Sequence, residues 1–190
     1  MRIITGTARG TKLATLEGDN TRPTPERVKE AIFSMIQFEL EDTSVLDLFS
    51  GSGQMGLEAL SRGAEKAHLI DRSPEAAAII RRNAEKTHLA DRCSIMNEDA
   101  AEYIKSSKGR RKFDFVFLDP PYGSGLLHET LWLLSDGKLL NDGARIFAED
   151  ENGDPFDGDT ALAEKYETVK STGYGRVHIS VLRLKKAAAE

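Results

Sequence analysis

Short, mostly apolar runs recur along the chain, and most are followed by a segment with apolar residues three and four positions apart. The runs are typical of strands buried on both faces. They are Ser44–Phe49, Ala67–Asp71, Cys93–Met96, Phe113–Leu118 and Ala144–Glu149. The segments between them are typical of amphipathic helices, and they are Gln54–Arg62, a segment that starts at Pro74, Asp99–Ser106 and Leu126–Leu134. This alternation predicts a parallel sheet with helices on both faces.

A further helix is predicted ahead of the first strand. Its apolar residues recur at helical spacing and are Val28, Ile32, Met35, Ile36 and Leu40. Thr24 suits the cap position, Pro25 the first helical position and Glu26 the first turn. The sequence therefore predicts that this helix begins at about residue 25.

The last part of the chain departs from the alternation. Two strand-like runs, Tyr166–Thr172 and Val177–Leu184, are separated only by Gly173-Tyr174-Gly175. No helix fits between them, so we expect an antiparallel hairpin. The expected fold class is α/β, a three-layer Rossmann-like sheet that is mostly parallel and ends in this hairpin.

The first residues predict a separate element. Met1–Arg22 is expected to form a short hairpin arm, with a strand near Arg2–Thr5 and turns at Gly6 and Gly10. The length of 190 residues suits one domain. We therefore divide the chain into an arm (1–22), a domain (23–184) and a disordered tail (185–190).

Composition favours a cytoplasmic protein. No apolar run approaches the roughly 20 residues that cross a bilayer, and the N-terminus lacks the apolar stretch of a signal peptide. The single cysteine, Cys93, cannot form an internal disulfide and is expected only to pack. The histidines are scattered without metal-ligand spacing, so no metal site is expected.

Charge is unevenly distributed. The net charge of −5 argues weakly against a nucleic-acid partner. However, basic residues outnumber acidic ones in the N-terminal arm, and a second basic cluster lies at 105–112. Acidic residues gather at 149–159. The distribution therefore leaves a nucleic-acid partner open. A solvated surface is the alternative for each cluster, and for the 105–112 cluster the two interpretations are equally favoured.

A glycine-rich motif follows the first predicted strand. Gly51, Gly53 and Gly56 form G-x-G-x-x-G at the start of a helix, where glycines let the backbone approach a ligand. Asp71 ends the next strand, in a position to bind a ribose hydroxyl pair. These features predict a nucleoside site; the alternative is a tight turn, with Asp71 merely capping near Ser73.

Asp47, on the strand before the glycines, separates the candidate ligands. A carboxylate there would repel a pyrophosphate, which binds helix-terminal N–H groups, but it would suit a cationic amino group. The terminal hairpin is also unlike a dinucleotide-binding half-repeat. Both features favour S-adenosylmethionine as the cofactor.

Asp99 and Ala100 follow the third predicted strand. Asp99 is placed to accept a hydrogen bond from the adenine amino group, while the Ala100 N–H approaches the ring. Asp99 equally suits a helix cap, with Glu102 completing a capping box. Both interpretations stay open, and one residue can serve both.

The run Asp119-Pro120-Pro121-Tyr122 follows the fourth strand, which we expect to lie where the strand order reverses and ligands bind. A fixed carboxylate and a fixed carbonyl can accept both hydrogens of an aromatic amine and direct its lone pair at a methyl carbon. The prolines hold that carbonyl rigidly. Tyr122 offers a stacking face, worth about 1–3 kcal/mol per base. The run therefore predicts methyl transfer to an exocyclic amine; the alternative is a rigid turn.

These residues resemble the N-methylating, S-adenosylmethionine-dependent enzymes of the class I fold. The sequence is most similar to the RsmD-type bacterial 16S rRNA guanine-N2 methyltransferases, nearly end to end. The segments that carry the resemblance are "RIITGTARGTKL" (Arg2–Leu13), "TRPTPERVKEAIFSMI" (Thr21–Ile36), "VLDLFSGSGQMGLEALSRGA" (Val45–Ala64), "DRSPEA" (Asp71–Ala76) and "FDFVFLDPPYGSG" (Phe113–Gly125). The resemblance implies methylation of the guanine 2-amino group in rRNA of the small subunit or its assembling particle.

The resemblance also implies roles for individual residues. Asp119, Pro120, Pro121 and Tyr122 would be catalytic. The cofactor-binding residues would be Asp47, Phe49, Gly51, Gly53, Gly56, Asp71, Arg72, Asp99 and Ala100. The arm would contact RNA, and the RNA-binding residues would be Arg9, Lys12, Arg22 and Arg27. We expect Arg9 and Lys12 to meet phosphates, the acidic segment 149–159 to face away from the substrate, and a monomer.

Other functions fit fewer of these features. A DNA adenine-N6 methyltransferase shares the chemistry, but this chain has no room for a separate target-recognition region. A protein glutamine methyltransferase has Asn where Asp119 stands. An NAD-dependent oxidoreductase leaves Asp47 and Asp119–Tyr122 unexplained, and a non-enzymatic RNA-binding module accounts for the arm alone.

Overall fold

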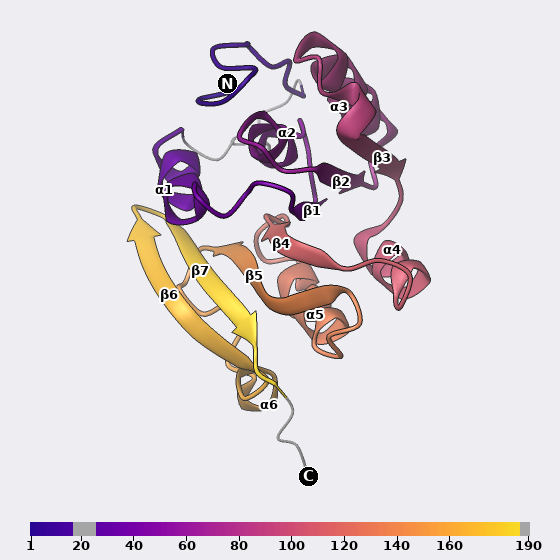
Figure 1. Cartoon of the computed structure of the whole chain (residues 1–190). Coiled ribbons are helices and arrows are strands. Elements are labelled where there is room, and N and C mark those ends of the chain that lie inside the picture. Colours follow the sequence, from indigo (N-terminus) through magenta and orange to yellow (C-terminus); the bar gives the residue numbers. More distant parts are fainter. Residues whose placement is uncertain (17–25, 187–190) are drawn as a thin grey trace. The chain divides into compact units, whose positions relative to one another are not determined.

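The computed structural model describes residues 1–16 and 26–186 (Figure 1). They fall into two compact units, Met1–Ala100 and Ala101–Glu190. The predicted cap at Thr24, the first helical position at Pro25 and the candidate RNA-binding residue Arg22 lie outside the described residues. The division into an arm, a domain and a tail stays a prediction.

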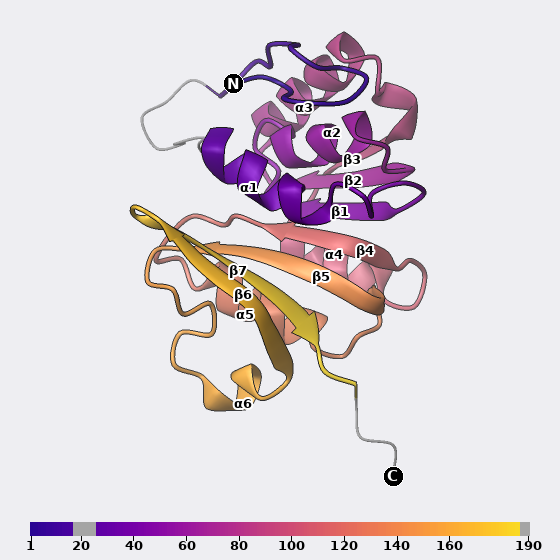
Figure 2. The same ribbon diagram turned by 60° about the vertical axis from the view of Figure 1, so that its left-hand side comes forward.

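The first unit contains a parallel sheet. Strand β1 (Ser44–Leu48) pairs with β2 (Lys66–Asp71), which pairs with β3 (Cys93–Asn97). Helices α2 (Gln54–Ser61) and α3 (Pro74–Lys86) pack against these strands, and Figure 2 shows both helices on the same side of the sheet. Helix α1 (Glu26–Ile36) precedes β1, and a short 3-10 turn, η1 (Ala90–Arg92), precedes β3. Because β1, β2 and β3 run parallel, their carboxyl ends lie along one edge of the sheet.

Local sequence explains where these helices start and stop. Ser73 caps α3 by accepting a hydrogen bond from the Ala76 N–H, and Pro74 occupies the first helical position, as predicted. Helix α2 ends at Ser61, before Gly63, which has a φ of 120°. Helix α1 buries Val28, Ile32 and others on one face, which confirms the predicted periodicity.

The N-terminal arm folds back on itself but does not form the predicted strand at Arg2–Thr5. Its two halves meet in one isolated antiparallel bridge, between Arg2 and Lys12. Backbone hydrogen bonds from the Ile3, Gly10 and Leu13 N–H groups also join the two halves, so the predicted short hairpin is present without a regular strand. Other backbone groups of the arm bond to α2. Ile4 and Thr5 donate their N–H groups to Glu58, and Ala8 donates to the Ser61 hydroxyl.

The second unit contains one parallel pair and an antiparallel hairpin. Strand β4 (Phe113–Leu118) runs parallel to β5 (Leu140–Asp150). Strand β7 (Val177–Leu184) pairs antiparallel with β5 on one side and with β6 (Tyr166–Tyr174) on the other. The predicted terminal hairpin is therefore confirmed (Figure 1).

Three helices accompany these strands. They are α4 (Ala100–Ser107), which begins at the last residue of the first unit, α5 (Leu126–Leu134) and α6 (Thr160–Ala163). The sequence predicted α4 and α5 but not α6, a single turn whose N-terminus Asp159 caps by accepting from the Leu162 N–H. In the described part of the chain, no helix is long and apolar enough to cross a membrane.

Candidate functional site

Asp47 and the glycine loop form a close-packed unit at the carboxyl end of β1. Asp47 is 4% exposed, and its Oδ2 atom accepts a 2.9 Å hydrogen bond from the Gly56 N–H. A Cβ atom at Gly56 would lie 2.8 Å from Cδ2 of Leu69 and 3.4 Å from this same Oδ2 atom. Gly56 therefore lets α2 approach both the carboxylate and β2.

The loop between β1 and α2 turns through left-handed backbone conformations. Phe49 has a φ of 65°, an uncommon value for a non-glycine residue. Gly53 has a φ of 77°, and a Cβ there would meet Leu69 and Ile80 at 3.0–3.1 Å. By contrast, a Cβ at Gly51 would meet nothing within 4 Å. The loop is therefore tightly packed at Gly53, whereas the space beside Gly51 is open.

Asp71 links this loop to the next helix. One carboxylate oxygen accepts from the Gly51 N–H at 2.8 Å, and the other accepts from the Ser73 N–H at 2.9 Å. The predicted juxtaposition of Asp71 with the glycine loop is therefore present. The alternative role of Asp71 near the start of α3 is present as well, so one side chain does both.

Burial changes the ionisation of Asp47. Burial raises the pKa of this carboxyl from 3.8 to about 7; the Gly56 N–H opposes that change, and the negative charge of Asp71 adds to it. The other Asp47 oxygen has no hydrogen-bond partner among the described residues. A buried carboxyl in this state favours a cationic partner, which would restore its charged form.

The remaining cofactor candidates lie around this edge. Asn97, at the end of β3, pairs with Asp71, and the Glu98 N–H donates to the Asp71 carbonyl. Asp99 follows directly and is exposed, while Ala100 is buried as the first residue of α4. Arg72 is exposed. The order of the strands thus places the Asn97–Ala100 segment on the edge that carries Asp71.

In the second unit, Asp119 to Tyr122 follow β4 directly. Pro120 is buried, Asp119 is half-buried, and Pro121 and Tyr122 are exposed. The Tyr122 side chain is 44% exposed, yet its hydroxyl donates a 2.6 Å hydrogen bond to Oε1 of Glu149. Burial, followed by this hydrogen bond, raises the pKa of the Tyr122 phenol. The ring is therefore presented to solvent while its hydroxyl is held.

Glu149 is a residue that the sequence interpretation missed. Its side chain accepts the hydrogen bond from Tyr122, a contact that was not predicted. The expectation that the acidic segment 149–159 faces away from the substrate stays a prediction. Glu149 is 7% exposed near the end of β5, one residue beyond the Leu118–Ala148 pair. Its position in the sheet was the available signal, since parallel neighbours carry their C-terminal residues to one edge.

The candidate RNA-binding residues are only partly grouped. Arg9, Lys12 and Arg27 are exposed. Arg9 lies in the turn of the arm, where its N–H donates to the Gly6 carbonyl, and the Lys12 carbonyl accepts a hydrogen bond from Lys86 on α3. Backbone hydrogen bonds therefore hold the described part of the arm, residues 1–16, while Arg9 and Lys12 are exposed on its surface.

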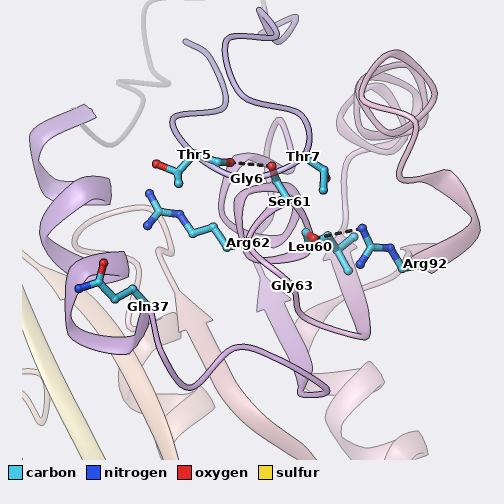
Figure 3. Close-up of a pocket in the computed structure, with 9 residues that line it drawn as sticks. All are labelled: Thr5, Gly6, Thr7, Gln37, Leu60, Ser61, Arg62, Gly63 and Arg92. Atoms are coloured by element: carbon cyan, nitrogen blue, oxygen red, sulfur yellow. Dashed lines mark hydrogen bonds between the residues drawn. The ribbon is translucent and has the colours of Figure 1, made fainter.

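A pocket of about 540 Å³ lies at the C-terminal end of α2, beside the turn of the arm (Figure 3). Its cations have structural partners: Arg62 donates to Glu58 at 2.7 Å, and Arg92 donates to the Leu60 and Ala64 carbonyls. None of the predicted cofactor residues lines this pocket. We assign it to the packing of the arm.

Two predictions about individual residue types can be compared with the structure. Cys93 is half-buried, and burial raises the pKa of its thiol to about 12, which agrees with a packing role. Within residues 1–16 and 26–186, no group of three or more His, Cys, Asp or Glu side chains could hold a metal ion.

Comparison with known proteins gives a consistent result. The family model "Conserved hypothetical protein 95" matches residues 1–183. Ribosomal RNA small subunit methyltransferase D of Escherichia coli strain K12 is 40% identical over 158 residues, covering 82% of this chain and 78% of the relative. The Haemophilus influenzae protein of the same name is 33% identical over 157 residues, covering 82% and 81%.

Solved structures show the same fold. The Escherichia coli protein yhhF superposes with a TM-score of 0.82 at 31% identity, covering 97% of this chain and 98% of that one. A Haemophilus influenzae methylase, HI0767, gives 0.80 at 28% identity with the same coverage. These matches confirm the predicted α/β Rossmann-like fold with its terminal hairpin. The chain belongs to the conserved hypothetical protein 95 family, the family of ribosomal RNA small subunit methyltransferase D.

Proposed function

We propose that this protein transfers a methyl group from S-adenosylmethionine to the exocyclic N2 amine of a guanine in bacterial 16S rRNA. The observation that carries the proposal is the arrangement at the end of β4. There, a carboxylate, two prolines and a solvent-facing Tyr122 ring follow a buried strand, in a chain of the methyltransferase D family. The substrate is rRNA of the small subunit or of its assembling particle, in the cytoplasm.

The first unit would hold the cofactor. Asp47 fits the cofactor's ammonium, because its buried carboxyl lacks a cationic partner among the described residues. Asp71 fits the ribose hydroxyls, since its two oxygens accept one N–H each and keep further lone pairs. The open surface above Gly51 gives a ligand room. S-adenosylmethionine, when bound, supplies a methyl group activated by a sulfonium.

Contacts to the adenine are proposed for the segment after β3. Asp99 would accept from the adenine amino group, and Ala100 would present its N–H to the ring. Phe49, Gly53, Gly56 and Arg72 complete the set, the glycines by shaping the loop. This assignment needs no step beyond binding and orientation of the cofactor.

Asp119 and Tyr122 would act on the guanine. The Asp119 carboxylate and the Pro120 carbonyl would accept hydrogen bonds from the two N–H groups of the amine and turn its lone pair out of conjugation. After methyl transfer, the cationic nitrogen would give up one of these protons to the Asp119 carboxylate. Pro120 and Pro121 keep these acceptors rigid. Tyr122 stacks on the base after the base has left its own stack, which costs a few kcal/mol. Preorganised acceptors of this kind lower the activation free energy of methyl transfer by an amount on the order of several kcal/mol, because positive charge develops on the nitrogen.

The RNA contacts would come from the basic residues of the arm and α1. Arg9, Lys12, Arg22 and Arg27 would neutralise phosphates, which positions the RNA without reading its sequence. The arm is suited to this role because Glu58 and Ser61 anchor its backbone. The backbone around Ile4, Thr5 and Ala8 is therefore held in place before RNA binds, which lowers the entropy lost on binding.

Calorimetry tests the cofactor assignment. We expect S-adenosylhomocysteine to bind the purified protein and NAD not to bind. Asp71→Asn should weaken the binding of S-adenosylhomocysteine, whereas the exposed Asp91→Asn on η1 serves as the matched control and should leave it unchanged. Binding of NAD without S-adenosylhomocysteine would overturn the proposed chemistry.

A further inference from the structure

A buried side-chain amide joins the N-terminal arm to the glycine loop. Asn83, in the last turn of α3, is fully buried. Its Oδ1 atom accepts from the Ala14 N–H at 2.8 Å, and its Nδ2 atom donates to the Ala14 carbonyl at 3.0 Å. The same Nδ2 atom also donates to the Ser52 carbonyl at 2.9 Å. Asn83 therefore holds the arm and the glycine loop through one planar group.

The two segments that Asn83 holds have separate proposed roles. Ser52 lies between Gly51 and Gly53, in the loop that would meet the cofactor. Ala14 lies two residues after Lys12, which would meet an RNA phosphate. Because both segments bond to the same side chain, a shift of either segment alters the hydrogen bonds of the other.

A second contact joins the same two segments. The Ser52 hydroxyl donates to the Met1 sulfur at 3.2 Å. The Met1 carbonyl in turn accepts from the N–H of Leu13, the residue before Ala14. A thioether sulfur is a weak acceptor, so the stronger part of the connection runs through Asn83. Both halves of the arm therefore reach the loop.

An amide suits this position because it both donates and accepts. Asn83 satisfies three backbone groups, two of Ala14 and one of Ser52. Ser52 is 8% exposed, and Ala14 is half-buried. A side chain that could not donate would leave the Ser52 carbonyl without this bond, and the loop would lose its connection to the arm.

We propose that Asn83 is a positioning residue that couples the arm to the glycine loop, so that a bound cofactor stiffens the arm and favours RNA binding. This inference rests on the proposed function for the identity of the two ligands, but the connection itself can be measured in the free protein. A cofactor that fixes the loop also fixes Asn83 and Ala14, so the arm loses less conformational freedom when it meets RNA. Because such coupling is reciprocal, RNA on the arm raises the affinity for the cofactor by the same factor.

Amide hydrogen exchange, followed residue by residue with NMR, tests the connection in the ligand-free protein. Lys86, three residues after Asn83 on α3, donates to the Lys12 carbonyl at 2.6 Å. Lys86→Met removes this bond and loosens the arm without touching the loop. The Gly53 N–H belongs to the same peptide group as the Ser52 carbonyl, and we expect Lys86→Met to speed its exchange about threefold or more. In an Asn83→Asp background, Lys86→Met should leave the exchange of this N–H unchanged.

Asn83→Asp is nearly isosteric but breaks the connection. One carboxylate oxygen still accepts from the Ala14 N–H, whereas the other meets two carbonyls to which it cannot donate. Asn83→Ala removes the same bonds without a buried charge and takes its place if the carboxylate unfolds the protein. Slow exchange of the β1 and β2 amides reports folding in the same spectra. Lys66→Met, which removes an exposed partner of Glu65, is the matched control and should leave Gly53 exchange unchanged.

S-adenosylhomocysteine tests the functional consequence. At saturation we expect it to slow the exchange of the Ala14 N–H about fivefold or more in the wild type, but not in Asn83→Asp. It should also tighten the binding of the wild type to small-subunit particles by about fivefold and leave the affinity of Asn83→Asp for the particles unchanged. A side chain that only stabilised the fold would change neither response.

The outcomes separate this inference from the proposed function. Gly53 exchange that does not respond to Lys86→Met, or that responds equally with Asn83→Asp present, would rule out the connection. Ala14 exchange that stays the same when S-adenosylhomocysteine saturates the protein would rule out the coupling. Failure of S-adenosylhomocysteine to bind would instead reject the proposed cofactor, and the Gly53 measurement would still decide whether Asn83 connects the arm to the loop.

Discussion

The side chains of Lys29 and Glu58 lie 3.4 Å apart, and neither is exposed to solvent. Lys29 also donates to the Arg2 carbonyl at 2.6 Å, and Glu58 accepts from the Ile4 N–H at 2.7 Å. Burial lowers the pKa of Lys29, and the Glu58 charge opposes that change. The arm is therefore anchored through a buried charge pair on α1 and α2.

Breaking this pair should destabilise the protein. Glu58→Ala leaves the Lys29 ammonium buried without its counterion, a change that costs about 3–5 kcal/mol. Urea denaturation should show this loss in the free energy of unfolding. The matched control is Glu65→Ala, which removes an exposed partner of Lys66 and should cost less than about 1 kcal/mol. Equal losses in the two variants would show that the buried pair has no special role.

The pKa of Asp47 predicts a pH dependence of stability. Because burial raises this pKa to about 7 from 3.8, the native protein holds a proton that the unfolded chain releases near pH 4. The contribution of Asp47 to stability is therefore complete below about pH 4 and is lost as the pH rises towards 7. Asp47→Asn cannot titrate, so the difference in unfolding free energy between variant and wild type should grow in favour of the variant across this range.

Thermal and urea unfolding of the ligand-free proteins between pH 4 and pH 8 measure this difference. Other titrating groups are common to both proteins and cancel in it. A difference that stays constant with pH would mean that Asp47 is ionised in the native protein, which would contradict the burial argument.

The glycine loop predicts a graded effect of added methyl groups. Gly53→Ala adds a Cβ at a φ of 77° and within 3.0 Å of Leu69, so strain and overpacking act together. We expect a loss of about 2–4 kcal/mol. Gly10→Ala is the control, since its φ is 83° but its Cβ meets nothing within 4 Å; it should cost about 1–2 kcal/mol. Denaturation of the two variants measures the packing contribution as their difference.

Much of this architecture follows from local sequence. The predicted bounds of β4 and α5 match the structure residue for residue, because Pro120 and Gly125 punctuate the chain there. The contact of Asp71 with the glycine loop also follows from the order of strands and helices. The bounds of an element can be predicted from sequence where its apolar periodicity ends at a residue, such as proline or glycine, that interrupts regular structure.

The missed features depend on long-range burial. Glu58 looks like an ordinary solvent-facing helix residue in the sequence, yet it is fully buried because the arm covers it. Glu149 was placed at the end of the fifth predicted strand, but its burial and its hydrogen bond to Tyr122 were not predicted. A charged residue carries no local signal that it will be buried, since that outcome depends on which distant segment packs over it.

Asp119 provides a prediction that separates chemistry from binding. Asp119→Ala removes the carboxylate that would accept from the target amine but leaves Asp47 and Asp71 untouched. We expect methyl transfer to fall by at least a thousandfold, while calorimetry with S-adenosylhomocysteine gives an affinity within about twofold of wild type. For Asp71→Asn, by contrast, we expect weaker binding of S-adenosylhomocysteine. A parallel loss of transfer and of cofactor affinity in Asp119→Ala would remove Asp119 from the chemical step.

The most direct test of the proposed function uses the natural substrate. Small-subunit particles from a strain that lacks the enzyme are incubated with the purified protein and methyl-labelled S-adenosylmethionine, and the rRNA is mapped by mass spectrometry. We predict one labelled guanine in 16S rRNA, with the label on N2, and no label with Asp119→Ala. Label on adenine or on protein, or particles that stay unlabelled while the protein binds S-adenosylhomocysteine, would contradict the proposed function.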